Sequence, residues 1–145
     1  MFLGTHHPKL DEKGRVTLPA KFREELSPGL VLTKGQDRSL VVWPIEEFNA
    51  YADRIREASR SDAKARAYSR VFFSSAFDQV PDRQGRVTLP PALRDYARLT
   101  AEAPAVVVGN HSTVEIWNAE EWERYLQAQE PQFADLSEEV VPGLF

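Results

Sequence analysis

Cysteine is absent from this 145-residue sequence, and its absence excludes disulfides, thiolate metal sites and thiol catalysis. No apolar run approaches the ~20 residues that a membrane-spanning helix needs. The first ten residues lack the charged start and the long apolar stretch of a secretory signal. We therefore expect a cytoplasmic protein without a membrane partner.

Motifs that mark common catalytic and nucleotide-binding sites are absent as well. The sequence contains no G-x-x-x-x-G-K-[ST], no G-x-G-x-x-G, no H-E-x-x-H and no G-x-S-x-G. A metal site needs three or four converging ligands, whereas the three histidines are the adjacent pair His6 and His7 and the distant His111. We expect no enzymatic activity, no metal, no cofactor and no small-molecule substrate.

Acidic residues outnumber basic residues, 22 to 18, and the formal net charge is −4. Taken alone, this value argues against a nucleic-acid partner. The distribution is uneven, however: residues 1–23 hold five Lys or Arg against two acids, whereas residues 71–145 hold five Arg against twelve acids. A phosphate backbone responds to local potential rather than to net charge, so the basic start of the chain remains a candidate DNA-binding region.

The sequence contains two similar copies of one unit in tandem. Residues 11–19 read DEKGRVTLP, and residues 82–90 read DRQGRVTLP. The similarity continues from 30–51 to 104–125, where the offset has grown from 71 to 74 residues, so the second copy carries a three-residue insertion within 97–104. Two long copies indicate a tandem duplication rather than a solenoid, which needs three or more short repeats.

The repeated block is typical of a β-hairpin. Asp11 and Gly14 bound a tight turn, because an aspartate can bond its own backbone and a glycine can take a positive φ. Residues 15–18 follow as a strand that alternates polar and apolar side chains. Asp82 and Gly85 hold the same positions in the second copy. The sequence thus predicts two hairpins with structural turns and charged tips.

Around the hairpins, the pattern predicts an α+β fold with a β-rich core and short helices. The predicted elements are helices after Pro19 and Pro90, strand pairs within 30–43 and 105–117, a strand over 72–80, and longer helices from Pro44 and Asn118. The predicted organisation is repeat 1 at 1–57, a connector at 58–70, repeat 2 at 71–130, and an acidic C-terminal tail at 131–145.

The duplicated block D-x-x-G-R-[VIL]-x-[LI]-P resembles the MraZ family of bacterial regulators, within the wider SpoVT/AbrB-like group. The match covers both repeats and so nearly the whole chain. This resemblance implies tandem units that interlock as swapped hairpins in a double-split β-barrel. It also implies a nucleoid-associated, sequence-specific DNA-binding regulator, usually a repressor, of the division and cell-wall gene cluster. Such proteins form rings of several protomers and bind short G-rich direct repeats upstream of their own operon.

Two interpretations stay open for Arg15 and Arg86. An arginine beside a hairpin tip can set its planar fork against guanine O6 and N7 in the major groove of double-stranded DNA. Alternatively, each arginine forms a structural ion pair with the aspartate of its own turn, Asp11 or Asp82. Both can hold if the pair breaks on binding.

Lys13 and Lys9 are predicted phosphate contacts, because an ammonium group positions DNA without specifying a base. A solvated hairpin face is the alternative. In the second copy Gln84 stands in place of Lys13 and Arg83 in place of Glu12. The basic residue has therefore moved by one position, to the opposite side of the strand or turn. We expect Arg83 to contact DNA and the more basic first hairpin to matter more.

A second hypothesis is an antitoxin of the MazE type, or another protein-binding module, in which the acidic C-terminal tail would be the binding arm. The complete second repeat speaks against it, because such antitoxins carry one copy of the motif and a long disordered arm. An enzyme is the third hypothesis, and no motif supports it.

Overall fold

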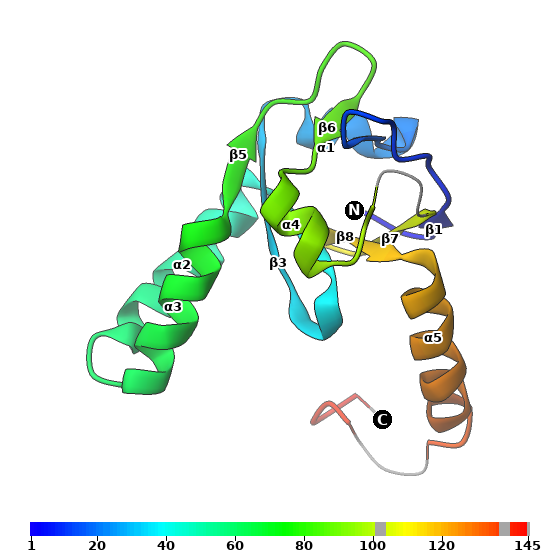
Figure 1. The fold of residues 1–145 in the computed structure, drawn as a ribbon. Helices are drawn as coiled ribbons and strands as arrows, with labels where there is room; N and C mark the ends of the chain where they lie inside the picture. Colours follow the sequence, from blue (N-terminus) through cyan, green and yellow to red (C-terminus); the bar gives the residue numbers. More distant parts are fainter. Residues whose placement is uncertain (101–103, 137–139, 145) are drawn as a thin grey trace.

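A computed structural model describes residues 1–100, 104–136 and 140–144 of the chain, which form an α+β fold (Figure 1). In chain order the elements are β1 (Thr5–His6), β2 (Arg15–Thr17), η1 (Ala20–Phe22), α1 (Arg23–Leu26), β3 (Leu30–Lys34), η2 (Gln36–Arg38), β4 (Leu40–Pro44), α2 (Ile45–Ser59), α3 (Ala63–Ser75), β5 (Phe77–Gln79), β6 (Arg86–Thr88), α4 (Pro91–Tyr96), β7 (Ala105–Asn110), β8 (Thr113–Asn118) and α5 (Ala119–Ala134).

The two copies exchange strands in the main sheet. This sheet is antiparallel, with the order β1-β7-β8-β4-β3-β5. The first strand of repeat 1, β1, pairs with β7 of repeat 2, and the first strand of repeat 2, β5, pairs with β3 of repeat 1. Neither copy therefore completes its half of the sheet with its own residues alone. The β-rich core expected from the sequence is confirmed, whereas the double-split barrel stays a prediction.

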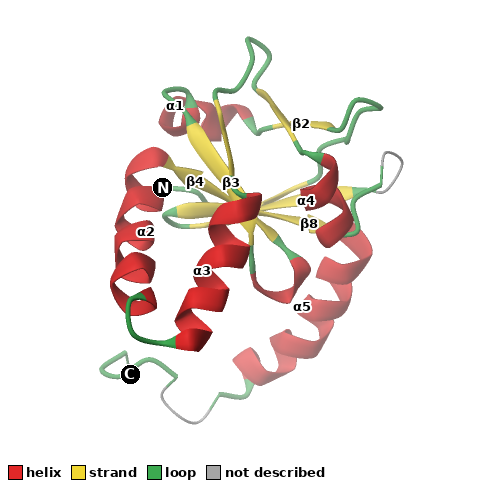
Figure 2. Cartoon of the chain, turned by 60° about the vertical axis from the view of Figure 1, so that its left-hand side comes forward, coloured by secondary structure: helices red, strands yellow, loops and turns green. Residues whose placement is uncertain are grey.

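A separate two-stranded ribbon joins the two repeated blocks. Strand β2 pairs with β6 in an antiparallel register that is symmetric about Val16 and Val87, which lie opposite each other. Beyond the strands, the N–H of Leu18 donates to the Gly85 carbonyl (2.9 Å) and the N–H of Leu89 donates to the Gly14 carbonyl (2.8 Å). The ribbon lies at one end of the molecule, and the turn between α2 and α3 and the C-terminal end of α5 lie at the other (Figures 1 and 2).

The alternating pattern of the repeated block places its apolar side chains in the core. Val16, Leu18, Val87 and Leu89 are all buried, with at most 1% of their surface exposed. Phe22 follows the first block and packs edge-on against Phe2, with the ring centroids 5.2 Å apart. The burial of one face leaves the opposite face of the ribbon toward solvent.

The strand predicted over residues 72–80 is wrong in its first half, because residues 72–75 belong to α3 and only Phe77–Gln79 form β5. Helix α3 begins within the predicted connector, where the Asp62 side chain accepts from the N–H of Lys64. Phe72, near its other end, packs against Tyr51 (5.4 Å) and Trp43 (6.1 Å) of repeat 1. Aromatic packing on α2 thus outweighs the strand preference of the Val71-Phe72-Phe73 run.

Helix α5 begins where the sequence predicts. The Asn118 side chain accepts from the N–H of Glu121 (3.1 Å), and Trp117 packs against Trp122 and Tyr125 (5.1 and 5.0 Å). The helix continues through Pro131 to Ala134, so its end does not coincide with the predicted start of the tail. In the part of the chain that the structure describes, no helix has the length and apolar character to span a membrane.

Substitution of Leu18 tests how much the core beneath the ribbon contributes to the stability of the fold. Leu18→Ala should lower the free energy of unfolding by about 2–5 kcal/mol, because it removes fully buried methyl groups and leaves a cavity. Leu3→Ala is the control, because half of the Leu3 side chain is exposed, and it should change the value by no more than ~0.5 kcal/mol. Urea denaturation measures the free energy of unfolding of both variants. Equal losses in the two variants would contradict the placement of Leu18 in the core.

Candidate nucleic-acid interface

The solvent-facing side of the ribbon carries four polar side chains in a symmetric arrangement. Arg15 lies opposite Thr88, and Thr17 lies opposite Arg86. Directly paired residues of an antiparallel ribbon point to the same face, and these four alternate with the buried valines. The two arginines thus lie diagonally across one face, and each stands directly after the turn of its own hairpin.

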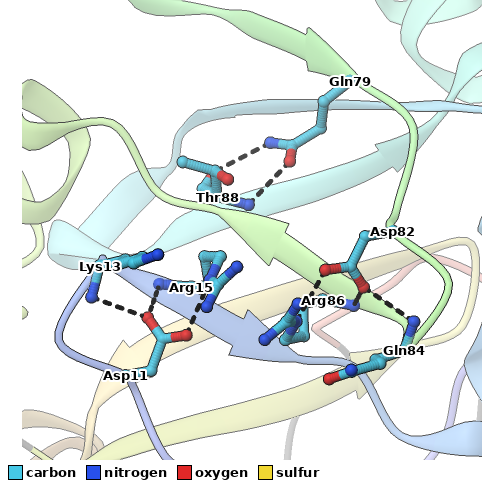
Figure 3. Close-up of polar contacts among 8 residues, drawn as sticks. All are labelled: Asp11, Lys13, Arg15, Gln79, Asp82, Gln84, Arg86 and Thr88. Atoms are coloured by element: carbon cyan, nitrogen blue, oxygen red, sulfur yellow. Dashed lines mark hydrogen bonds and ion pairs between the residues drawn. The ribbon is translucent and has the colours of Figure 1, made fainter.

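Asp11 organises the first hairpin turn. Its Oδ1 accepts from the backbone N–H groups of Lys13 (3.0 Å) and Arg15 (2.8 Å), and its Oδ2 accepts from Nε of Arg15 (2.8 Å). Gly14 closes the turn with φ +76°, a conformation that favours glycine, and donates its N–H to the Asp11 carbonyl. One carboxylate therefore fixes both the backbone of the turn and the arginine side chain (Figure 3).

Asp82 does the same in the second hairpin. Its Oδ1 accepts from the N–H groups of Gln84 and Arg86 (both 2.9 Å), and its Oδ2 accepts from Nε of Arg86 (2.7 Å). Gly85 repeats the φ of +76°. The two hairpins thus present equivalent aspartate–arginine pairs beside each other on one surface (Figure 3).

Hydrogen bonds to the ionised carboxylates shift their titration. The backbone N–H of Arg15 is the largest cause that lowers the pKa of Asp11 below its ordinary value, with further lowering from the Arg15 side chain and the N–H of Lys13, whereas burial raises this pKa. The pKa of Asp82 is lowered in the same way, first by the N–H of Arg86. Both turns therefore favour the charged form of the aspartate.

The ion pairs leave part of each arginine available. Only Nε is engaged, and within the described residues the Nη1 and Nη2 groups of Arg15 and Arg86 have no hydrogen-bond partner. About a quarter of each arginine side chain is exposed. The structural ion pair is thus present, and it leaves free the end of the guanidinium that can donate two parallel hydrogen bonds.

The other predicted contacts surround the ribbon as exposed charges. Lys9 precedes the first turn, Lys13 lies within it, and Arg83 lies within the second turn. None of their charged groups forms an ion pair in the ranges that the structure describes. The structure places these cations on the same two hairpins as Arg15 and Arg86.

Two further arginines, Arg23 and Arg94, adjoin the hairpins and were missed by the sequence analysis. Nε of Arg23 donates to the Leu18 carbonyl (3.2 Å), and Nε of Arg94 donates to the Leu89 carbonyl (2.9 Å). The two residues are separated by 71 positions, the offset of the repeated block. That shared offset was the signal available in the sequence.

Gln79 distinguishes the second hairpin from the first. Its side-chain amide donates to the Thr88 carbonyl (2.9 Å) and accepts from the Thr88 N–H (2.8 Å), as a neighbouring strand would (Figure 3). The residue at the matching position of repeat 1 is Pro8, which has no such amide. The two halves of the ribbon are therefore similar in their turns and different at their outer edges.

These features define a class: a duplicated α+β protein whose two copies share one arginine-bearing ribbon. The chain matches the model of the family described as "MraZ protein, putative antitoxin-like" twice, over residues 1–71 and 72–141. It belongs to the MraZ family, as the sequence motif predicted.

Full-length relatives support the assignment. Proteins from Salinispora arenicola (strain CNS-205) and Parafrankia sp. (strain EAN1pec) are each 58% identical to this chain over 99% of its length, and cover 100% and 99% of their own lengths. A protein from Leifsonia xyli subsp. xyli is 57% identical over the whole of both chains. All three are named "Transcriptional regulator MraZ".

Acid should loosen the two turns at a pH below the usual titration range of aspartate. A carboxylate whose pKa is lowered on folding stabilises the fold above its unfolded pKa, and this stabilisation is lost as the pH falls through the folded value. Carboxyl-detected NMR titration of Asp11 and Asp82 should give midpoints below the ordinary value of an aspartate in a short unfolded peptide, with the amides of Lys13 and Arg15 following Asp11. Midpoints equal to or above the peptide value would contradict the turn geometry.

Proposed function

We propose that this chain is a sequence-specific DNA-binding transcriptional regulator, and not an enzyme, that reads double-stranded DNA with the exposed face of the β2–β6 ribbon. The observation that carries the proposal is the pair of arginines on that face, each oriented by an aspartate of its own turn. The major groove of B-DNA is wide enough to admit a two-stranded ribbon. The name of the relatives, transcriptional regulator, agrees with this use.

In this proposal the cations divide into two roles. Arg15 and Arg86 donate from their free guanidinium ends to guanine O6 and N7. Lys13, Lys9 and Arg83 contact phosphates, which supply affinity and register without sequence preference. The structural turns at Asp11, Gly14, Asp82 and Gly85 hold the reading arginines at a fixed orientation.

The resemblance to the MraZ family supports a more specific role. We propose a cytoplasmic, nucleoid-associated repressor of the division and cell-wall gene cluster, which binds short G-rich direct repeats in the promoter upstream of its own operon. The strand exchange between the copies supports the SpoVT/AbrB-like swapped-hairpin description of the fold. The proposed units remain 1–57 and 71–130, with 58–70 between them and the acidic tail after residue 130.

We also propose a homo-oligomeric ring. A groove of about 450 Å³ lies between the two halves and is lined by aromatic side chains from both, among them Trp43, Tyr68, Trp117 and Tyr125. The α2–α3 region at 53–70 carries six basic and three acidic residues, whereas α5 carries four acidic residues and one basic residue. Two different surfaces of opposite charge favour head-to-tail contact between protomers, and such contacts form a ring when the rotation between neighbouring protomers closes.

Substitutions on the first hairpin separate the two DNA-contact roles. Arg15→Ala should weaken operator binding by about 1–3 kcal/mol per engaged hairpin and leave binding to random DNA nearly unchanged. Lys13→Ala should weaken binding to the operator and to random DNA equally. It should also reduce the slope of log affinity against log salt concentration by about one per lost phosphate contact. Arg86→Ala should cost less than Arg15→Ala, because the first hairpin is more basic.

Gel shifts with the DNA upstream of the gene and a scrambled G-rich competitor measure these effects, and melting temperatures control for folding. If Arg15→Ala is as stable as the parent and keeps its full preference for the operator, the ribbon is not the reading surface.

The oligomer proposal predicts a particle larger than a dimer at micromolar concentration, as measured by light scattering. Charge reversal on either surface, by Arg66→Glu with Arg70→Glu or by Glu120→Lys with Glu123→Lys, should shift it toward the monomer. Combining the two reversals should restore assembly, because opposite charges again face each other. A monomeric parent with full DNA affinity, or reversals without effect, would refute the proposed contact.

A further inference from the structure

Arg23 and Arg94 each reach the turn of the other repeat. A Cβ added to Gly14 would lie 2.9 Å from both Cζ and Nε of Arg94, and a Cβ added to Gly85 would lie 2.7 Å from Cδ and Cζ of Arg23. Such separations are closer than real Cβ atoms come to neighbouring side chains. Each guanidinium therefore packs directly on the face of a glycine, and only glycine leaves the space for it.

Hydrogen bonds close this contact into a loop. The carbonyl of Gly85 accepts from the N–H of Leu18, and the carbonyl of Leu18 accepts from Nε of Arg23, whose guanidinium covers Gly85. In the other direction, the carbonyl of Gly14 accepts from the N–H of Leu89, and the carbonyl of Leu89 accepts from Nε of Arg94, whose guanidinium covers Gly14. Each turn is thus tied to the strand end and the arginine of the opposite repeat.

We infer that Arg23 and Arg94 are crossed positioning residues: Arg94 orients the hairpin that carries Arg15, and Arg23 orients the hairpin that carries Arg86. The glycine beneath each guanidinium directly precedes the arginine that is proposed to read DNA. A shift of the turn would therefore move that arginine relative to the groove. Each hairpin depends on the other repeat, and its own aspartate fixes only its local shape.

The contact needs a planar guanidinium rather than a positive charge alone. Nε must donate to the carbonyl while the flat group lies against the glycine, and a lysine ammonium cannot satisfy both. Arg94→Lys should therefore fail to replace Arg94. A direct phosphate contact by Arg94 would instead be largely preserved by lysine, because phosphate affinity depends on charge. The lysine variant distinguishes positioning from direct contact.

Amide hydrogen exchange tests the crossed dependence without DNA. In Arg94→Ala the Gly14 amide should exchange at least tenfold faster while Gly85 is unchanged, because only the Gly14 turn loses its cover. Arg23→Ala should give the reverse pattern. Arg124→Ala on α5 removes an exposed arginine away from the ribbon and should affect neither glycine. If an alanine variant does not fold, the corresponding methionine variant, which keeps an unbranched side chain, is measured instead.

Operator affinity supplies a second measurement, which rests on the proposed function. Arg94→Ala should reduce affinity about tenfold, with little further loss when combined with Arg15→Ala and an additive loss when combined with Arg86→Ala. The inference would be overturned if Arg94→Ala or Arg23→Ala accelerated amide exchange equally at Gly14 and Gly85. It would also be overturned if Arg94→Lys kept the operator affinity of the parent. If the exchange rates show the crossed pattern but the parent protein does not bind the operator, the inference is upheld and the proposed function is refuted.

Discussion

The pairing of β2 with β6 is the constraint on which the rest of the structure depends. Each strand has only three residues, and an isolated two-stranded ribbon is marginal in water. The pairing becomes stable because Val16 and Val87 are fully buried, and because Leu18 and Leu89 extend the hydrogen bonds into the opposite turns. The β1–β7 and β5–β3 pairs also join strands of different copies, so each copy contributes a strand to the other copy's part of the main sheet.

Features set by neighbouring residues could be predicted from the sequence. The turn at Asp11 uses hydrogen bonds that span at most four residues, and glycine at position 14 supplies the positive φ. The same spacing at Asp82 gives the same geometry. The Asn118 cap of α5 is local for the same reason. Short-range patterns thus predicted both turns and the arginines that follow them. The predicted pairing of each return strand with its own repeat was wrong, because β2 and β6 pair with each other instead.

Features set by contacts between the copies could not be predicted in this way. Residues 72–75 have a strand-like composition, yet Phe72 joins the aromatic cluster of repeat 1 as part of α3, and tertiary packing of this kind overrides local preference. Arg23 and Arg94 carry no motif of their own. Their role depends on Gly85 and Gly14, 62 and 80 residues away in the sequence, which only the folded pairing brings into contact.

Fusion of the two copies in one chain also permits them to differ. Two identical single-copy subunits would have identical hairpins and would favour a palindromic site, because operator symmetry mirrors protein symmetry. Here Lys13 is matched by Gln84, and Gln79, which seals the edge of β6, is matched by Pro8. Under the proposed function, one protomer therefore presents two unequal hairpins with a fixed direction along the DNA. A head-to-tail ring repeats that direction from protomer to protomer, which suits direct repeats rather than inverted ones.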